Sequence, residues 1–321
     1  MNDGSLRCWG FNGSGQLGDG TQTSRATPAP VPGLTDAISV AAGGSHSCAV
    51  LTDTTVRCWG ANRYGQLGDG TTQDRASAVT VRGLTGVVSL ALGGEHSCAR
   101  LRDGSVRCWG RNPAGQLGDG TRADHFTPVA VSGLDHVAQL ALGVQHGCVV
   151  RDDGSAWCWG RNDHRQLADG TEQNHVTPFA VPGLSGSVSQ ISAGDAHTCA
   201  LLADRHVMCW GWNNSGQLGD GSIVMRAPPA LVPNLADAAE IALGPSRTCA
   251  RRTDGTVWCV SRTTQPAQIV GITDAVSLSV AGGHACALRN DGTLRCWGRN
   301  RAGELGTGAM SERSEVVAVV W

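Results

Sequence analysis

The stretch Cys98–Thr121, which reads CARLRDGSVRCWGRNPAGQLGDGT, sets the pattern for the whole chain. Nearly the same letters begin at Cys48, Cys148 and Cys199, and parts of them recur towards both ends. The second cysteine of the unit returns at intervals of 50, 50, 50, 51, 50 and 37 residues in a chain of 321. A fixed period of this length indicates a repeat architecture rather than a series of unrelated domains.

One unit of the pattern predicts four short strands. Apolar and β-branched runs alternate with Gly-Gly and Asp-Gly breaks, and helical periodicity is weak. In the unit that follows Gly83, the expected strands are residues 87–92, 96–101, 105–109 and 128–131. Seven such units predict an all-β fold, a seven-bladed β-propeller that forms one domain over residues 1–321.

The chain begins and ends within a repeat unit, so each end contributes only part of one. Met1 aligns with Leu101, and Trp321 aligns with Gly133. The 17 repeat positions equivalent to 134–150 are therefore found at neither end. They would contribute two strands, so we expect one blade to be incomplete and the chain to be truncated by about 17 residues at the ring closure.

The incomplete blade leads to two further expectations. We expect the hairpin remnant around Cys8 to join segment Val316–Val320 in a defective seventh blade, with Cys8 unpaired. A copy of the missing residues fused before Met1 should then bridge Cys8. Elsewhere, the unit at 249–272 lacks the Trp-Gly-Asn-Gly-Gln-Leu segment, so its blade should have a shortened outer edge.

The cysteines form six pairs with a constant separation, and the turn at Asp103-Gly104 places Cys98 opposite Cys108. Opposed residues in a non-hydrogen-bonded antiparallel pair lie about 4.5 Å apart at Cα, within the range of a disulfide. Such bridges would staple blade-edge strands and require an oxidising compartment, outside the cell or at its surface. The alternative is reduced cysteines that act as small apolar residues. The expected pairs are Cys48 with Cys58, Cys98 with Cys108, Cys148 with Cys158, Cys199 with Cys209, Cys249 with Cys259, and Cys286 with Cys296.

Metal and catalytic sites are not predicted. A His-x-Cys pair recurs once per unit, but pairs separated by whole blades cannot complete a four-ligand zinc site, and Arg247 replaces one histidine. We expect these histidines to bond neighbouring backbone groups. Leu-Gly-Asp-Gly-Thr lacks the ligands of a Ca²⁺ loop and the Lys of a P-loop, so it predicts a tight turn. No catalytic set stands out, and no enzyme activity, cofactor or metal is expected.

The charge balance argues against nucleic acid and membrane as partners. The net charge is −2 without runs of like charge, whereas nucleic-acid binding needs clustered Lys and Arg. No stretch reaches the apolar length of a membrane span, and MNDGSLRCWG shows no signal-peptide pattern.

The repeated sequence motifs resemble those of the regulator of chromosome condensation family. They are Gly93-Gly94-Glu95-His96-Ser97-Cys98-Ala99, Asp103-Gly104, Trp109-Gly110-Arg111-Asn112 and Gly115-Gln116-Leu117-Gly118. The resemblance implies a seven-bladed β-propeller. The member that exchanges nucleotide on the GTPase Ran also carries a basic tail and a blade insertion, and neither is present here. A guanine-nucleotide exchange role is therefore the least favoured function.

Function should lie where the copies differ, at Phe11, Arg63, Tyr64, Arg111, His164, Arg165, Trp212, Arg299 and Arg301. A second variable set follows the Asp-Gly-Thr turn at Arg75, His125, His175 and residues 223–225. Aromatic residues and Arg are favoured at interface hot spots, although drift on solvated loops would also vary these positions.

We therefore predict a non-enzymatic, exported, monomeric scaffold that presents these loops to a protein partner. The family includes a secreted bacterial propeller that inhibits β-lactamases. The resemblance to it in fold and compartment implies a bacterial chain and leaves open a role as inhibitor of a secreted enzyme.

Overall fold

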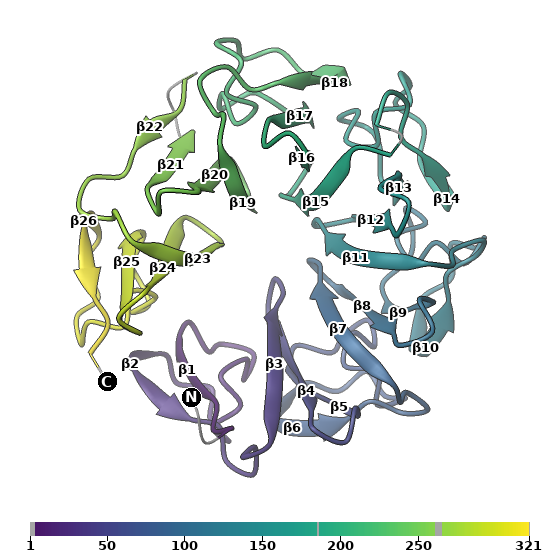
Figure 1. Cartoon of the computed structure of the whole chain (residues 1–321). Helices are drawn as coiled ribbons and strands as arrows, with labels where there is room; N and C mark the ends of the chain where they lie inside the picture. Colours follow the sequence, from purple (N-terminus) through teal and green to yellow (C-terminus); the bar gives the residue numbers. More distant parts are fainter. Residues whose placement is uncertain (1–3, 185, 261–264, 321) are drawn as a thin grey trace.

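The chain forms a ring of small antiparallel sheets around a central opening (Figure 1). The computed structural model describes residues 4–184, 186–260 and 265–320. Over these ranges the secondary structure consists of strands, without a helix. Consequently, the described residues contain no helix of the length and apolarity needed to cross a membrane.

Each complete blade is one four-stranded sheet whose strands follow in chain order. Blade 1 contains β3 (Ala37–Ala42), β4 (His46–Leu51), β5 (Val56–Gly60) and β6 (Arg75–Thr80). Blade 2 contains β7 (Val87–Leu92), β8 (His96–Leu101), β9 (Val106–Gly110) and β10 (His125–Ala130). Blade 3 contains β11 (Val137–Leu142), β12 (His146–Arg151), β13 (Ala156–Gly160) and β14 (His175–Ala180).

The second half of the ring continues this order. Blade 4 contains β15 (Val188–Ala193), β16 (His197–Leu202), β17 (Val207–Gly211) and β18 (Arg226–Leu231). Blade 5 contains β19 (Ala238–Gly244), β20 (Arg247–Arg252), β21 (Val257–Val260) and β22 (Ala267–Gln268). Blade 6 contains β23 (Ala275–Val280), β24 (His284–Arg289), β25 (Leu294–Gly298) and β26 (Arg313–Ala318).

The remaining strands, β1 (Arg7–Gly10) and β2 (Arg25–Pro30), form a two-stranded sheet, here called the two-stranded unit. The propeller architecture is confirmed, but within the described ranges the ring has six four-stranded blades and this unit, so seven full blades are not confirmed. By repeat position, β1 and β2 correspond to the third and fourth strands of a blade.

The hairpins have the register that the turn length predicts. In blade 2, the Asp103-Gly104 turn brings β8 and β9 together with Cys98 opposite Cys108. Gly104 has φ +79°, a left-handed conformation that a residue with a Cβ adopts at a cost. The disulfide lies between the second and third strands, which both pair on two sides. The expectation that the staples support edge strands is therefore wrong.

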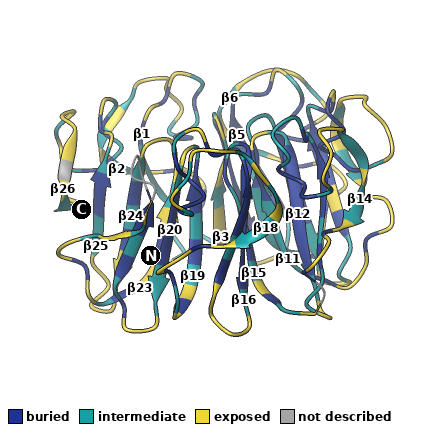
Figure 2. Cartoon of the chain, turned by 90° about the horizontal axis from the view of Figure 1, so that it is seen from above, coloured by how far each residue is buried: buried dark blue, intermediate teal, exposed yellow. Residues whose placement is uncertain are grey.

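The core lies between blades rather than within one sheet. One cluster combines the Cys48–Cys58 bridge of blade 1 with Val87, Ala99 and Trp109 of blade 2. Figure 2 shows the consequence, with buried strands in the body of the ring and exposed loops on both faces. A single sheet has no partner for its apolar face, so each blade depends on its neighbours.

The ring closes differently from the expectation. Val316, Val317 and Ala318 lie in β26, which pairs with β25 as the outer strand of blade 6. Cys8 lies in β1 and pairs with β2 at Ala29. The prediction that the Cys8 hairpin and the C-terminal segment share one sheet is therefore wrong, because the C-terminal segment completes the sheet of its own repeat.

Blade 5 has the shortened outer edge that its sequence predicts. Its outer strand β22 has 2 residues, whereas the outer strands of blades 1–4 have 6. Residues 261–264 of the shortened connection lie outside the described residues.

Candidate protein-binding face

The segment between the third and fourth strands of a blade is here called the Gly-rich loop. It spans residues 61–74 in blade 1. Asn62 organises it: its side-chain carbonyl accepts from Leu67 N at 2.9 Å, and its Nδ2 donates to Asp69 Oδ1 and Thr71 O, each at 3.1 Å. The repeated Asn and Asp therefore shape a turn, as predicted for Leu-Gly-Asp-Gly-Thr.

Three members of the second variable set, Arg75, His125 and His175, support the same loop. Arg75 and His175 pair with the loop aspartates Asp69 and Asp169, at 3.0 and 2.7 Å. Burial by itself would raise the pKa of Asp69. Hydrogen bonds from Thr71 and Arg75 outweigh that effect and hold the pKa below its usual value. Variation between Arg and His at this position is explained by the shared aspartate partner rather than by a binding role.

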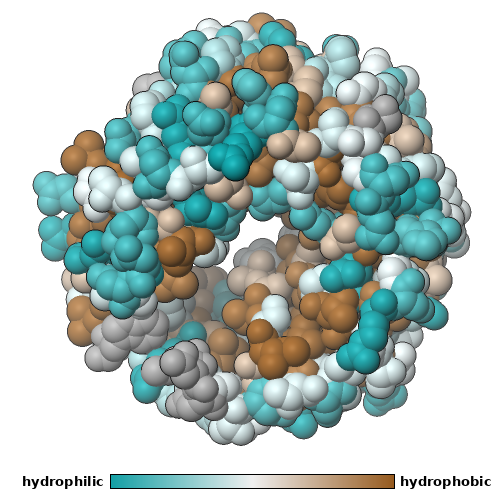
Figure 3. All heavy atoms as spheres, viewed as in Figure 1, coloured by the Kyte–Doolittle hydropathy of each residue, from teal (hydrophilic) through white to brown (hydrophobic). Residues whose placement is uncertain are grey.

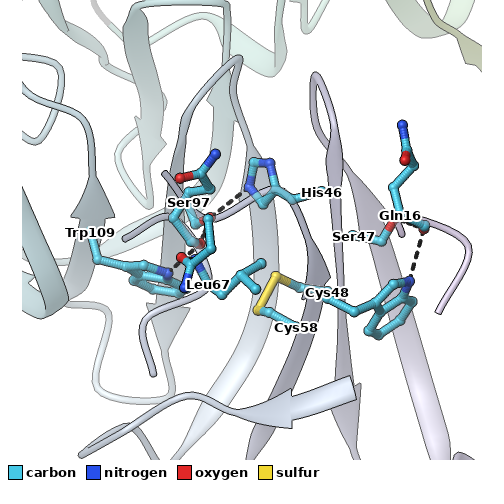
Figure 4. Close-up of a disulfide and its surroundings, with 11 residues drawn as sticks. Gln16, His46, Ser47, Cys48, Cys58, Leu67, Ser97 and Trp109 are labelled. Atoms are coloured by element: carbon cyan, nitrogen blue, oxygen red, sulfur yellow. Dashed lines mark hydrogen bonds between the residues drawn. A yellow bond between two sulfur atoms is a disulfide. The ribbon is translucent and has the colours of Figure 1, made fainter. Parts of the chain in front are cut away.

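The Gly-rich loop also joins neighbouring blades (Figure 4). The Gln66 carbonyl of blade 1 accepts hydrogen bonds from Trp109 Nε1 and Ser97 Oγ of blade 2, both at 2.8 Å. Ser97 Oγ also lies 2.9 Å from His46 Nε2. The Gln-Leu pair of one repeat and the Trp of the next are thus parts of one buried joint.

The repeated histidines belong to this joint. His46, His146 and His197 contact the hydroxyl of the following blade, which belongs to Ser97, Thr198 and Thr248 respectively. The expectation that they bond backbone groups is wrong, because the nearest partner is a side chain. Burial lowers the pKa of His46 and His146 to about 4, so these rings are neutral. Among the described residues, no group of three or more His, Cys, Asp or Glu is placed to hold a metal ion.

All six expected cysteine pairs are bridged in the structure. The Cα–Cα distance is 4.1 Å in each, close to the expected spacing. In chain order the bridges join Cys48 to Cys58, Cys98 to Cys108, Cys148 to Cys158, Cys199 to Cys209, Cys249 to Cys259, and Cys286 to Cys296.

Each bridge links the second and third strands of its blade and lies close to the blade core. Cys158 and Cys296 are 0% exposed, Cys209 is 1% exposed and Cys259 is 4% exposed. The alternative of small apolar residues also expects this burial, so burial by itself does not distinguish the two readings of the cysteine pairs. The remaining cysteine in the described ranges, Cys8, is free and half-buried. Burial raises the pKa of its thiol to about 12, with a smaller contribution from Asp19.

The predicted binding residues lie on the face that carries the start of each Gly-rich loop. Two of them meet across the boundary between blades 1 and 2: the Arg111 guanidinium lies 4.7 Å from the centre of the Tyr64 ring. Arg63 lies 5.6 Å from the same ring, and Arg111 also forms an ion pair with Glu95. The arrangement is a cation–π cluster in which two cations lie near one aromatic ring.

A second contact crosses the boundary between blades 3 and 4. The rings of His164 and Trp212 are stacked, with centroids 5.3 Å apart. Arg165 pairs with Glu172 beside them at 3.0 Å. Phe11, on the two-stranded unit, is 55% exposed and lies over Gly13, so the ring offers apolar surface to solvent.

The remaining two predicted residues, Arg299 and Arg301, line a cleft of about 790 Å³ between blades 5 and 6. Arg247 and Arg313 line it as well, so four arginines line one cleft, here called the arginine cleft. Glu312 pairs with Arg301 at 2.8 Å, and Glu304 lies 3.9 Å from Arg299. The surplus of cations makes the arginine cleft suitable for carboxylates, which Arg binds in a bidentate manner.

The missing part of the blade 5 loop explains why a cleft lies here. In blades 1–4, the indole N–H of Trp59, Trp109, Trp159 or Trp210 donates to the carbonyl of the preceding Gln. Blade 5 lacks the Gly-Gln-Leu-Gly motif that would supply this carbonyl. The buried Nε1 of Trp297 in blade 6 consequently has no hydrogen-bond partner among the described residues. Trp297 lines a second hollow of about 610 Å³ at the same boundary.

Sequence reasoning missed Arg313, and it treated Arg247 only as the residue that excludes a metal. A signal was present for Arg247, because it breaks the histidine pattern in the blade before the one that contributes Arg299. Nothing in the sequence indicated that Arg313 faces the same cleft, since β26 starts a long way along the chain from β20.

Two family models match the chain. The model described as RCC1-like domain matches residues 1–260, and that of the regulator of chromosome condensation (RCC1) repeat matches residues 276–304. The first covers well over half of the sequence, and together they span blades from both halves of the ring.

Several solved structures have the same fold. Human WBSCR16 has 21% identity and a TM-score of 0.89, covering 99% of this chain and 95% of its own. Prp20p from Saccharomyces cerevisiae has 22% identity and a TM-score of 0.86, with coverages of 98% and 86%. The ectodomain of the Arabidopsis thaliana receptor kinase ACR4 has 18% identity and a TM-score of 0.55, with coverages of 84% and 83%. At these identities the likeness is one of fold.

Proposed function

The chain belongs to the RCC1-like domain family, and we propose that it is a non-enzymatic scaffold whose arginine cleft binds an acidic segment of a partner protein. The observation that carries this proposal is the group of four arginines around one cleft, on the face that also holds the Tyr64 and Trp212 contacts. Arg and aromatic residues are the types that dominate the energy of protein interfaces.

The geometry supports a peptide or loop rather than a small neutral ligand. The cleft is open, and its walls come from the turns at Ser246 and Gly283 and from the loop that starts at Arg299. Several cations around one opening favour a ligand with more than one carboxylate. Electrostatic attraction of this kind also raises association rates at low ionic strength.

Relatives with this fold support a binding role without identifying the partner. The structure of Prp20p was described together with its binding to Gsp1p and histones. At 22% identity the fold carries over but the partner does not. Inhibition of a secreted enzyme and nucleotide exchange would each be a specific form of partner binding. No residue described above favours one over the other, so both stay as alternatives within the proposal.

Export of the protein is part of the same proposal. Six disulfide bridges are stable in an oxidising compartment and rare in the cytosol. The ACR4 structure is of an ectodomain, so a ring of similar fold lies outside a cell in that protein. Thiol titration of the denatured, unreduced protein should find one reactive thiol and thirteen after reduction. Thirteen thiols before reduction would contradict export.

The binding proposal is tested with a hexaglutamate peptide as the probe and hexaglutamine as its neutral counterpart. We expect the full chain to bind the acidic peptide with a salt-dependent Kd, and the double variant Arg299→Glu, Arg301→Glu to bind it at least tenfold more weakly. The control, Arg102→Glu, makes the same type of charge change in the hairpin turn on the opposite face. Equal affinity for all three proteins, or equal affinity for both peptides, would contradict the proposal.

A further inference from the structure

The boundary between blades 5 and 6 keeps its tryptophan but lacks the loop that the tryptophan contacts elsewhere. At five other boundaries the indole N–H donates to a carbonyl of a Gly-rich loop at 2.8–2.9 Å. These pairs are Trp9 with Glu304, Trp59 with Gln16, Trp109 with Gln66, Trp159 with Gln116, and Trp210 with Gln166. Trp297 is 5% exposed, and its buried Nε1 has no hydrogen-bond partner among the described residues. A buried donor without a partner is costly, so a ligand that supplies a carbonyl here is favoured.

The other members of the interblade joint are replaced at the same boundary. Arg247 stands at the position of the repeated histidine, and Ala285 stands at the position of the repeated Ser or Thr hydroxyl. The connection between β21 and β22 spans only 261–266, against 61–74 for the Gly-rich loop of blade 1. Histidine, hydroxyl and loop are thus all absent from one joint, and Trp297 is the member that remains.

The course of the missing loop follows from blade 1, where the stretch from Gln66 to Gly68 packs against blade 2. Gln66 lies beside Gly110, since a Cβ on that glycine would be 3.3 Å from the Cα of Gln66. Gly68 lies between Trp109 and Val81, because a Cβ there would be 2.9 Å from the nearest atom of each. A Gln-Leu-Gly stretch therefore needs three neighbours, namely a glycine, a tryptophan and an aliphatic residue.

The same three neighbours are present at the boundary between blades 5 and 6. They are Gly298, Trp297 and Ile269 by repeat position. Gly298 lines the arginine cleft, and Trp297 and Ile269 line the second hollow at this boundary. The two hollows thus correspond to the two ends of the missing stretch. A ligand of that shape would run from the arginine cleft past the Trp297 indole into the second hollow.

The second hollow has the apolar walls that a leucine requires. The leucine of the Gly-rich loop is 0% exposed in four other repeats, at Leu67, Leu117, Leu167 and Leu305. Val81, at the position of Ile269, is 2% exposed, whereas Ile269 is half-buried and the adjacent Val270 is 87% exposed. Figure 3 shows apolar and polar residues side by side at the outer edge of the ring, on the side where Figure 1 places β22 and β26. An apolar side chain in the hollow would restore the burial seen in other blades.

The arginine cleft indicates which residue should precede this stretch. In blade 1, Tyr64 lies two positions before Gln66, and its ring centre is 4.7 Å from the Arg111 guanidinium. Arg299 is the equivalent of Arg111, so the corresponding ligand residue would lie beside Arg299. A carboxylate at that place can pair with the guanidinium. The residue between them, Gly65, has φ +76°, a conformation that favours glycine.

We propose that the boundary between blades 5 and 6 binds a loop of the partner protein with the pattern acidic residue, Gly, any residue, Leu, Gly. The acidic side chain pairs with Arg299, the carbonyl of the middle residue accepts from Trp297 Nε1, and the leucine fills the second hollow beside Ile269. The inference rests on the proposed function, because it specifies the segment that the arginine cleft binds. The chain's own Gly-Gln-Leu-Gly copies bury their leucines, so they are not free to act as this ligand.

The test uses calorimetric titration of the full chain with three acidic peptides. The leucine peptide is Glu-Glu-Gly-Gln-Leu-Gly with both ends blocked, the alanine peptide has Ala in place of its Leu, and the third is hexaglutamate. We expect the leucine peptide to bind about tenfold more tightly than the alanine peptide, because only the leucine fills the second hollow.

Two variants test the contact to the middle carbonyl. Trp297→Phe removes the N–H and should weaken binding of the leucine peptide about fivefold, with the affinity for hexaglutamate unchanged. The matched control Trp157→Phe makes the same change in blade 3, where the indole N–H donates to Ser155, and should leave both affinities unchanged.

The second variant, Ala285→Ser, adds the hydroxyl that Ser97 supplies to the Gln66 carbonyl in the joint between blades 1 and 2. It should strengthen binding of the leucine peptide about threefold, because the docked carbonyl gains a second donor. Its control is Ala287→Ser, which places a hydroxyl at another position of the same strand that is also 0% exposed, and which should give no gain. A gain of binding is not produced by a variant that merely disturbs the fold.

The outcomes separate this inference from the proposed function. Equal affinity for the leucine and alanine peptides, with hexaglutamate still bound, would overturn the inference and leave the acidic-segment proposal standing. Failure of all three peptides to bind would overturn both. The indole N–H resonance of Trp297, identified by its loss in Trp297→Phe, should shift when the leucine peptide binds, and an unshifted resonance would also overturn the inference. So would a dimer of the parent chain that the leucine peptide dissociates, since a second copy would then be the ligand.

Discussion

At the boundary between blades 1 and 2, His46, Ser97, Trp109 and the Gln66 carbonyl form one buried chain of hydrogen bonds. At the boundary between blade 6 and the two-stranded unit, Trp9 Nε1 donates to the Glu304 carbonyl, and no hydroxyl contact to His284 is seen among the described residues. Trp109 is fully buried, whereas Trp9 is half-buried. The comparison shows that a blade's tryptophan and loop can dock by themselves, but that sealing the core requires the inner strands.

The largest expected effect concerns the two tryptophans. Trp109→Ala removes a fully buried ring and its hydrogen bond, which should lower the free energy of unfolding by about 3–5 kcal/mol. Trp9→Ala should cost clearly less, because part of that ring already faces solvent. Denaturant unfolding of the two variants measures the difference. Equal losses would mean that the incomplete boundary is as well packed as the complete one.

The next effect concerns the disulfides. Replacing both Cys98 and Cys108 by Ser should lower the free energy of unfolding by about 2–3 kcal/mol, the loop-closure value for so short a loop. Cys8→Ser should change it little, because Cys8 has no bridge to lose. Thermal melts of both variants provide the measurement. The single variant Cys98→Ser should also leave Cys108 as a second reactive thiol, detectable by labelling after denaturation.

The pH dependence of stability should also separate the two boundaries. His46 has a folded-state pKa of about 4, below its unfolded value of about 6.5, so the unfolded chain binds more protons between these pH values. Stability should therefore fall as the pH drops through this window. From pH 7 to pH 5 the expected loss is about 2 kcal/mol for His46.

His46→Gln should remove that part of the dependence, which denaturant melts at pH 7 and pH 5 would measure. At the boundary between blade 6 and the two-stranded unit, burial lowers the pKa of His284 too, but Glu304 opposes the shift. His284→Gln should consequently flatten the profile less than His46→Gln. A larger effect from His284 would show that this boundary is better sealed from water than the half-buried Trp9 indicates.

The smallest expected difference comes from two serines at the same repeat position. Ser97→Ala removes the partner of His46 and one donor to the Gln66 carbonyl, which should cost about 1–3 kcal/mol. Ser47 donates to the Gln16 carbonyl, but the two-stranded unit before it has no histidine strand. Ser47→Ala should therefore cost less, about 1 kcal/mol. Urea unfolding of both variants would test this, and a larger loss at Ser47 would contradict the described joint.

The sequence alone determined the features that depend on neighbours in the chain. The period predicted the blades, and the Asp103-Gly104 turn predicted that Cys98 lies opposite Cys108. The absence of the Trp-Gly-Asn-Gly-Gln-Leu segment predicted the short outer strand of blade 5. These inferences hold because the geometry of a hairpin is set by its turn length and by the alternation of side chains along a strand.

The tertiary structure decided the contacts between blades. The sequence located Tyr64, Arg111, His164 and Trp212 as variable positions, but only the ring places them in pairs across blade boundaries. It also brings Arg247, Arg299, Arg301 and Arg313 to one cleft, and it assigns Val316–Ala318 to blade 6 rather than to the strand of Cys8. The physical reason is that these contacts depend on how one sheet is rotated and packed against the next, which residues within a single repeat do not encode.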